Sequence, residues 1–304
     1  MSRFNELLQR TPQTTTGIIA LCVILHVVTK VLLDLNLRIF TLCPQLVIYR
    51  LEIYRIATSA LFHGNIMHLA MNMMTTLAIG SLLEKRFGTF RLLLIILWSI
   101  LLTGILYIGI ALFLAIIIQK NQLMRQHSVG FSGVIFHLSV LESNLGTHQS
   151  RSVFGFFDVP SYLYPWVLLV GLQIFMPGLS FTGHLVGILV GTLQLYGGLN
   201  WILWGEERLK RVDNWSRLDF LTRQHNFCPT TAETGCQVGG QSSSLMGSVR
   251  QGSVIVRRFL FYVLAGIQSI LFSSYNPVNT FEDEDDWDGL PLYSDDQSER
   301  GEMV

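Results

Sequence analysis

The sequence predicts an all-α polytopic membrane protein, a bundle of six transmembrane helices followed by a cytosolic tail. Half of the 304 residues are hydrophobic and only 14% are charged. The mean hydropathy is +0.44 and the formal net charge is zero. This composition is typical of polytopic membrane proteins and not of soluble globular domains. Because the chain has no excess of positive charge, we do not expect nucleic acid as a partner.

Apolar runs of the length of membrane helices recur over the first two thirds of the chain. A helix needs roughly 20 apolar residues to cross the hydrocarbon core. The fifth run opens with Pro160 and Pro165 and ends at Pro177-Gly178, and Gly197-Gly198 closes the sixth, as helix ends predict. The six predicted spans are residues 17–33, 66–83, 92–118, 129–141, 160–176 and 181–196.

The segments outside these runs define the predicted domain organisation. Residues 1–16 form a short polar arm, residues 17–198 the membrane domain and residues 199–304 a cytosolic tail. Residues 34–61 are too polar to span and too apolar for a free linker, so we predict a loop in the membrane interface. Six spans place both termini on one side. A modest bias of Lys and Arg indicates that this side is the cytosol.

The predicted tail divides by composition. Residues 201–221 combine tryptophans with basic residues, as expected for a helix on the membrane surface. Residues 226–251 are rich in Gly, Ser and Thr and are predicted to be a flexible linker. Residues 259–272 would reach only about 21 Å as a helix, so we predict an interfacial helix and not a seventh span. The acidic run at 282–288 belongs to a predicted disordered end.

One short motif, Gly130-Phe131-Ser132-Gly133, carries the candidate chemistry. Its glycines keep the backbone approachable around a serine hydroxyl at the start of a helix. With 26 glycines in the chain, such a motif also arises by chance, so it is weak alone. Its predicted depth in the membrane is more informative.

Three predicted spans place polar side chains at one depth. Spans two, four and six run in the same direction and end at the cytosolic face. Ser132 lies roughly 15 Å from the cytosolic end of its helix, and Asn72 and His184 lie roughly 18 Å from theirs. In a core about 30 Å thick, all three are near mid-depth, and His68 is one turn from Asn72. Because span four covers only about 20 Å, we expect a protein-enclosed cavity at its N-terminal end.

These residues resemble the motifs of the rhomboid family of intramembrane serine proteases. Glu84 to Gly88 is similar to the E-x-R-x-G segment after the family's second span. Ser128 to Val134 and Gly183 to Gly191 are most similar to the family's eukaryotic endoplasmic-reticulum branch, whereas Tyr54-Arg55 departs from the Trp-Arg of many members. The resemblance covers about residues 54–198, in the family's order. It rests on His68-Leu69 with Asn72, on Gly130 to Gly133, and on Gly183-His184 with Gly187 and Gly191.

The resemblance and the chemistry of these side chains together imply a catalytic dyad. Ser132 is the expected nucleophile and His184 the expected general base, with no carboxylate at their depth to orient the histidine. The oxyanion hole is expected from His68 and Asn72 together with the backbone around Ser132, at Gly130 and Phe131.

Four further residues are expected to support this dyad. Phe136, one turn beyond the serine, is expected to pack on the imidazole of His184 and orient it. Gly133, Gly183 and Gly187 are expected to support the dyad, and Gly187 with Gly191 forms a small-xxx-small face that would let span six approach span four closely.

No cofactor or metal is expected. The spacing of His225, Cys228 and Cys236 fits no usual zinc pattern, and the four cysteines are too scattered for a disulfide framework. His63 is expected to bond the first loop, and no role is expected for the remaining histidines, which are His26, His127, His137 and His148.

The predicted function is therefore an intramembrane serine endopeptidase that cleaves transmembrane segments of protein substrates. The resemblance implies membrane protein quality control in the endoplasmic reticulum, or another secretory-pathway membrane, and contacts of the tail with the degradation machinery there. One alternative is a catalytically silent rhomboid-like adaptor, although such relatives typically lack the serine or the histidine. A transporter would call for inverted repeats, which the sequence does not show. Single polar residues in spans also serve simply as packing contacts between helices.

Overall fold

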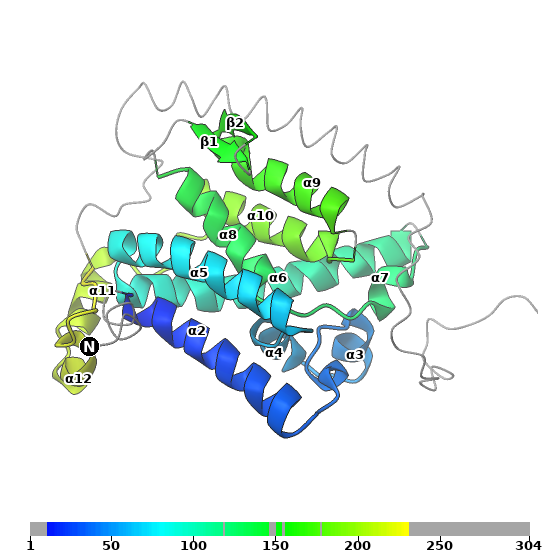
Figure 1. Ribbon diagram of the computed structural model, residues 1–304, viewed down its shortest axis with the longest axis horizontal. Coiled ribbons are helices and arrows are strands. Elements are labelled where there is room, and N and C mark those ends of the chain that lie inside the picture. Colours follow the sequence, from blue (N-terminus) through cyan, green and yellow to red (C-terminus); the bar gives the residue numbers. More distant parts are fainter. Residues whose placement is uncertain (1–10, 118, 146–149, 154–155, 177, 231–304) are drawn as a thin grey trace, which may run out of the picture.

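The computed structural model describes residues 11–230, apart from residues 118, 146–149, 154–155 and 177, as a mostly helical bundle (Figure 1). Three helical stretches are long and apolar enough to cross a membrane: Gln13–Leu32, Ile66–Phe87 and Thr89–Ile117. The first consists of α2 (Gln13–His26) and a π-helical segment (Val27–Leu32), and the others are α5 and α6. The three remaining predicted spans are shorter helices, namely α8 (Ser132–Ser143), α9 (Tyr164–Phe175, after a 3-10 turn at Ser161–Leu163) and α10 (Phe181–Leu195).

The first loop is ordered by one buried arginine. It contains a 3-10 turn (Leu37–Ile39), α3 (Pro44–Tyr49) and α4 (Arg55–Leu61). Arg55 is only 5% exposed and donates hydrogen bonds to the carbonyl oxygens of Arg38 and Thr41. It also forms an ion pair with Glu52 at 2.6 Å. The loop is therefore anchored although tyrosine precedes this arginine.

The prediction of an all-α protein is wrong in one detail. The segment between α8 and α9 contains an antiparallel pair of short strands, β1 (Ser150–Val153) and β2 (Phe157–Pro160). Arg151 of β1 forms an ion pair with Glu142, which is 2% exposed near the end of α8. The hairpin therefore joins α8 to the start of α9 (Figure 1).

Helix α8 lies at the centre of the bundle, with ten of its twelve residues buried. It packs against α5, α6, α9 and α10. Its closest contact is with α10, because glycines occupy the crossing. A Cβ on Gly187 would come within 2.2 Å of the carbonyl oxygen of Gly133, and one on Gly191 within 2.9 Å of that of His137. This confirms the close approach expected from the glycine pattern.

A buried carboxylate holds the opposite end of the bundle together. Glu84 has no exposed surface and accepts hydrogen bonds from the backbone N–H groups of Thr14 and Thr15, the first turn of α2. It also accepts from the hydroxyl groups of Thr15 and Thr89. Its carboxylate oxygens accept from N–H groups that have no partner within α2, and its negative charge is favourable at the N-terminus of this helix. Gly88, with a φ of 94°, makes the sharp turn from α5 into α6.

The residues after α10 return to this end of the bundle. They form α11 (Glu206–Asp213), a 3-10 turn (Ser216–Leu218) and α12 (Asp219–Thr222). Cys228 exchanges two hydrogen bonds with Thr89, at 2.7 and 3.0 Å, and Asn226 donates to the carbonyl of Thr11. The prediction of a flexible linker from residue 226 is therefore wrong for residues 226–230. The predicted helix at 259–272 and the acidic run at 282–288 lie outside the described residues.

Candidate active site

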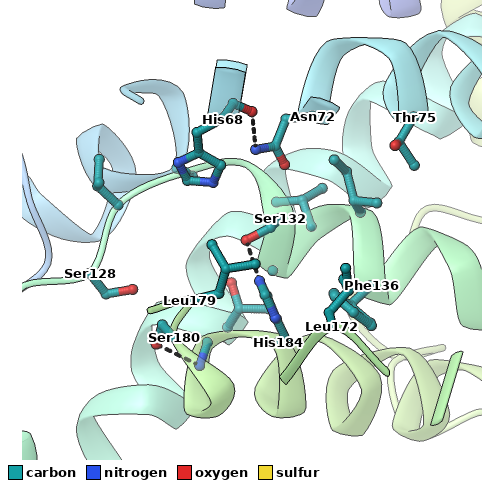
Figure 2. Close-up of a pocket in the computed structure, with 18 of the residues that line it drawn as sticks. His68, Asn72, Thr75, Ser128, Ser132, Phe136, Leu172, Leu179, Ser180 and His184 are labelled. Atoms are coloured by element: carbon teal, nitrogen blue, oxygen red, sulfur yellow. Dashed lines mark hydrogen bonds between the residues drawn. The ribbon is translucent and has the colours of Figure 1, made fainter. Parts of the chain in front are cut away.

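The polar residues predicted to share one depth line a single cavity of about 840 Å³ between α5, α6, α8, α9 and α10. Figure 2 shows His68 and Asn72 of α5 on one side of Ser132 and His184 of α10 on the other. Because the cavity adjoins the first turn of α8, the short α8 has space at its N-terminal end, as expected.

Ser132 and His184 are hydrogen-bonded. The distance from Ser132 Oγ to His184 Nε2 is 2.9 Å (Figure 2), and His184 is 4% exposed. Ser132 is the first residue of α8, and His184 lies in the first turn of α10. The side chain of Ser180 caps α10 by accepting a hydrogen bond from the N–H of Gly183 at 3.1 Å. Two fixed helix starts therefore present the hydroxyl and the imidazole to each other.

Phe136 packs on the imidazole of His184. The two ring centroids are 4.6 Å apart and the rings are inclined by 27°. Phe136 is 3% exposed, so this contact is held within the core. A stacked ring restricts the rotation of the histidine side chain and keeps Nε2 directed at Ser132. The predicted packing of Phe136 is confirmed.

His68 and Asn72 lie next to each other on α5. Asn72 is 5% exposed and donates from Nδ2 to the carbonyl oxygen of His68 at 2.8 Å. This bond leaves the second N–H of the carboxamide, which can donate towards the cavity. The ring of His68 lies over Gly130, where a Cβ would come within 2.5 Å of its Cε1 atom. Only glycine fits this position, which also has a φ of 124°.

Gly130 and Phe131 have a different role from the one predicted. The N–H of Gly130 donates to the carbonyl oxygen of Ser59 at 2.7 Å, and that of Phe131 donates to His63 Nε2 at 3.4 Å. Because both groups already have acceptors, these residues hold the loop in place and are not donors to the cavity. The first N–H groups of a helix have no partner within it, and Ser132 and Gly133 both line the cavity.

Sequence reasoning missed the contacts that hold this loop. Ser128 pairs with Leu42 through two backbone hydrogen bonds of 2.8 and 2.9 Å, and His127 is hydrogen-bonded to Thr41 at 2.6 Å. His63 also contacts the serine loop, because its Nε2 atom accepts the N–H of Phe131. No spacing rule links residues so distant in the chain, so only the tertiary structure shows these contacts. His137, for which no role was expected, is hydrogen-bonded to Gln194 at 2.8 Å.

Metal binding has no visible basis in the described part of the chain. Between residues 11 and 230, no group of three or more His, Cys, Asp or Glu side chains is placed to hold a metal ion. Cys236 lies outside the described residues.

The proteins of known name that are similar to this chain include several rhomboid proteins. The chain is 33% identical over 237 residues to Rhomboid-like protein 15 of Arabidopsis thaliana, which covers 77% of this chain and 57% of that protein. It is 37% identical over 149 residues to Rhomboid-related protein 4 of Homo sapiens, covering 49% and 47%. It is also 26% identical over 212 residues to Rhomboid-type serine protease 2 of Gibberella zeae, covering 65% and 76%.

The first two of these matches span only about half the length of the relatives. The Rhomboid domain matches residues 50–201, which is half of the chain and includes both Ser132 and His184. Rhomboid relatives include both active proteases and inactive pseudoproteases. On this match, and on these relatives, the chain belongs to the rhomboid family.

Proposed function

We propose that this protein is an intramembrane serine endopeptidase that cleaves the transmembrane segments of protein substrates. The observation that carries the proposal is the 2.9 Å hydrogen bond between Ser132 Oγ and His184 Nε2. This pair lines a cavity that lies between apolar helices. Nucleophilic acyl transfer requires a nucleophile and a base that takes its proton, and a serine beside a histidine provides both.

In the proposed reaction, Ser132 Oγ attacks the carbonyl carbon of the scissile peptide bond while His184 takes the hydroxyl proton. The C–N bond then breaks as His184 gives that proton to the leaving amine, and an acyl-serine remains. Water then attacks the acyl carbon and gives a proton to His184. The bond between this carbon and Ser132 Oγ breaks as His184 returns the proton to Oγ, and the second product leaves with a new carboxyl group. Phe136 replaces an orienting carboxylate by holding the imidazole plane.

The tetrahedral intermediates carry a negative charge on the former carbonyl oxygen. Donors on the α5 side of Ser132 are His68 and the free N–H of the Asn72 carboxamide. The backbone N–H of Ser132 adds a donor at the N-terminus of α8, where the helix dipole also favours negative charge. Such preorganised donors commonly contribute a factor of about 10² to 10³ each.

We also propose six membrane crossings with both ends of the described region on the cytosolic side. The hydrogen bond between Asn226 and Thr11 puts the two ends of this region together, as an even number of crossings requires. In Figure 1, α5, α8 and α10 run in the same direction. Helix α8 has only 12 residues and is about 18 Å long, which is shorter than the hydrocarbon core. We propose that it still crosses, because the surrounding helices shield its ends from lipid.

The proposed location is the endoplasmic-reticulum membrane, with another secretory-pathway membrane as the alternative. Support comes from the resemblance of the serine and histidine motifs to the family's endoplasmic-reticulum branch. The proposed partners are transmembrane protein substrates, the lipid bilayer and, through residues beyond α10, the degradation machinery of that organelle.

Covalent labelling of the serine tests the proposed chemistry. A fluorophosphonate probe is expected to modify Ser132 in the purified wild type, as shown by peptide mass spectrometry. The His184→Asn variant is expected to react much more slowly, because the hydroxyl then lacks a base. A wild type that stays unlabelled, or a variant labelled equally fast, would contradict an activated serine and favour the silent adaptor.

A further inference from the structure

His63 is a buried histidine that the proposed reaction does not use. It lies in the short loop between α4 and α5, five residues before His68, and has no exposed surface. A buried polar side chain needs a partner, because its loss of hydration is otherwise uncompensated. Its partners therefore indicate what it is for.

The contacts of His63 include the serine loop and His68. Its Nε2 atom accepts the N–H of Phe131 at 3.4 Å, directly before Ser132. Its ring meets the ring of His68 edge to face, with centroids 5.3 Å apart and an interplanar angle of 70°. Since His68 in turn lies over Gly130, one imidazole supports both sides of the proposed oxyanion site.

Three successive anchors hold the serine loop. Ser128 pairs with the backbone of Leu42, the N–H of Gly130 donates to the carbonyl of Ser59, and the N–H of Phe131 donates to His63. The first two anchors use backbone acceptors. The third is a side chain and is the anchor nearest to Ser132, so substitution can remove it alone.

We propose that His63 is a positioning residue for the proposed proteolytic reaction, on which this inference rests. It holds the Phe131 N–H and the His68 ring, and thereby fixes the spacing between Ser132 Oγ and the donors on α5. Displacement of a reacting group by about 1 Å can cost about 100-fold in rate. His63 thus acts on the reaction through its neighbours without touching the substrate.

Two substitutions separate this role from simple space filling. His63→Gln keeps an acceptor, since the Gln Oε1 atom can replace Nε2, whereas His63→Leu removes it. We expect the leucine variant to lose about 10- to 100-fold in kcat on a transmembrane substrate with little change in KM. The glutamine variant is expected to stay within a few-fold of wild type. Rates are divided by active sites, counted by titration with the fluorophosphonate.

His137 provides the matched control. It is also a buried histidine with one hydrogen bond, but its partner is Gln194 and it does not contact the serine loop. His137→Leu is expected to lower the unfolding midpoint while keeping the wild-type kcat per titrated site. If the loss in the His63 variants were only structural, they would behave in the same way.

Hydrogen exchange gives a readout that does not need activity. Amides of residues 128–134 are expected to exchange faster in His63→Leu than in wild type or His63→Gln. Wild-type exchange and wild-type kcat in the leucine variant, or an equal loss in the glutamine variant, would overturn the inference. If the leucine variant does not fold, His63→Met replaces it, since methionine adapts to irregular spaces. An inactive wild type would overturn the proposed function, and exchange would still decide the role of His63.

Discussion

Ser132 and His184 meet because glycine lies at the crossing of their helices. The hydroxyl and the imidazole come from the first turns of α8 and α10, whose backbones nearly touch at Gly133 and Gly187. Around this pair, each neighbour has a separate task. Phe136 packs on the imidazole that we propose as the base. Asn72 is bound to its own helix through one N–H, and its second N–H can donate.

At the residue scale, Asn72→Ala is expected to lower kcat by roughly 10² to 10³, because it removes one oxyanion donor. KM and expression are expected to change little. Steady-state cleavage of a transmembrane reporter in liposomes measures both parameters.

Asn144→Ala is the control for this prediction. Its Nδ2 also donates to the carbonyl four residues earlier, at 2.8 Å, but from the far end of α8. If both alanine variants turned over like wild type, Asn72 would serve only as a packing contact.

At the element scale, the helices differ in how they are held. Helix α8 is buried almost all round, whereas α5 and α6 each expose an apolar face, as lipid-facing helices do. The contact between α8 and α10 depends on glycine, because a Cβ at Gly187 or Gly191 would overlap atoms of α8. The hairpin adds an ion pair from Arg151, which is partly exposed, to the buried Glu142 near the end of α8.

Gly187→Ala is expected to cost about 1–3 kcal/mol of stability, because its Cβ would overpack the carbonyl of Gly133. The same displacement separates Ser132 from His184, so activity should fall together with the thermal midpoint. Differential scanning fluorimetry and the cleavage assay measure the two effects.

Gly109→Ala in α6 is the matched control, since a Cβ there meets nothing within 4 Å. It is expected to be neutral or slightly stabilising, as alanine is in a helix. Equal behaviour of the two variants would mean that the close crossing is not required.

The apolar helices and the gathering of their polar residues around one cavity could be predicted, because both follow from local periodicity and from the rise of a helix. The pairing of Ser132 with His184, the packing of Phe136 and the glycine crossing were correctly anticipated in this way. The roles of Gly130 and Phe131 were not, because their acceptors, Ser59 and His63, come from a distant loop. The hairpin was missed because its strands are only four residues long.

At the scale of the whole molecule, the two ends of the described chain meet beside a buried carboxylate. Glu84 binds the start of α2 and, through Thr89, the residues that follow α10. The composition of residues 226–251 predicted a flexible linker. The hydrogen bonds between Cys228 and Thr89 are tertiary contacts, which composition does not indicate.

Truncation tests whether residues 206–230 belong to the folded body. A chain that ends after residue 230 is the reference for this comparison. A chain that ends after residue 205 loses the Thr89–Cys228 hydrogen bonds and the fully buried Leu209, so its midpoint should fall by several degrees. Equal midpoints would show that this segment only rests on the bundle.

Cleavage of a transmembrane reporter by purified protein in liposomes tests whether Ser132 and His184 form a catalytic dyad. Wild type is expected to cleave the reporter, and Ser132→Ala and His184→Ala are expected not to cleave it. Ser143→Ala, which removes a buried serine whose hydroxyl donates only within α8, is predicted to cleave at nearly the wild-type rate. An inactive wild type, or a Ser132→Ala variant as active as wild type, would contradict the account.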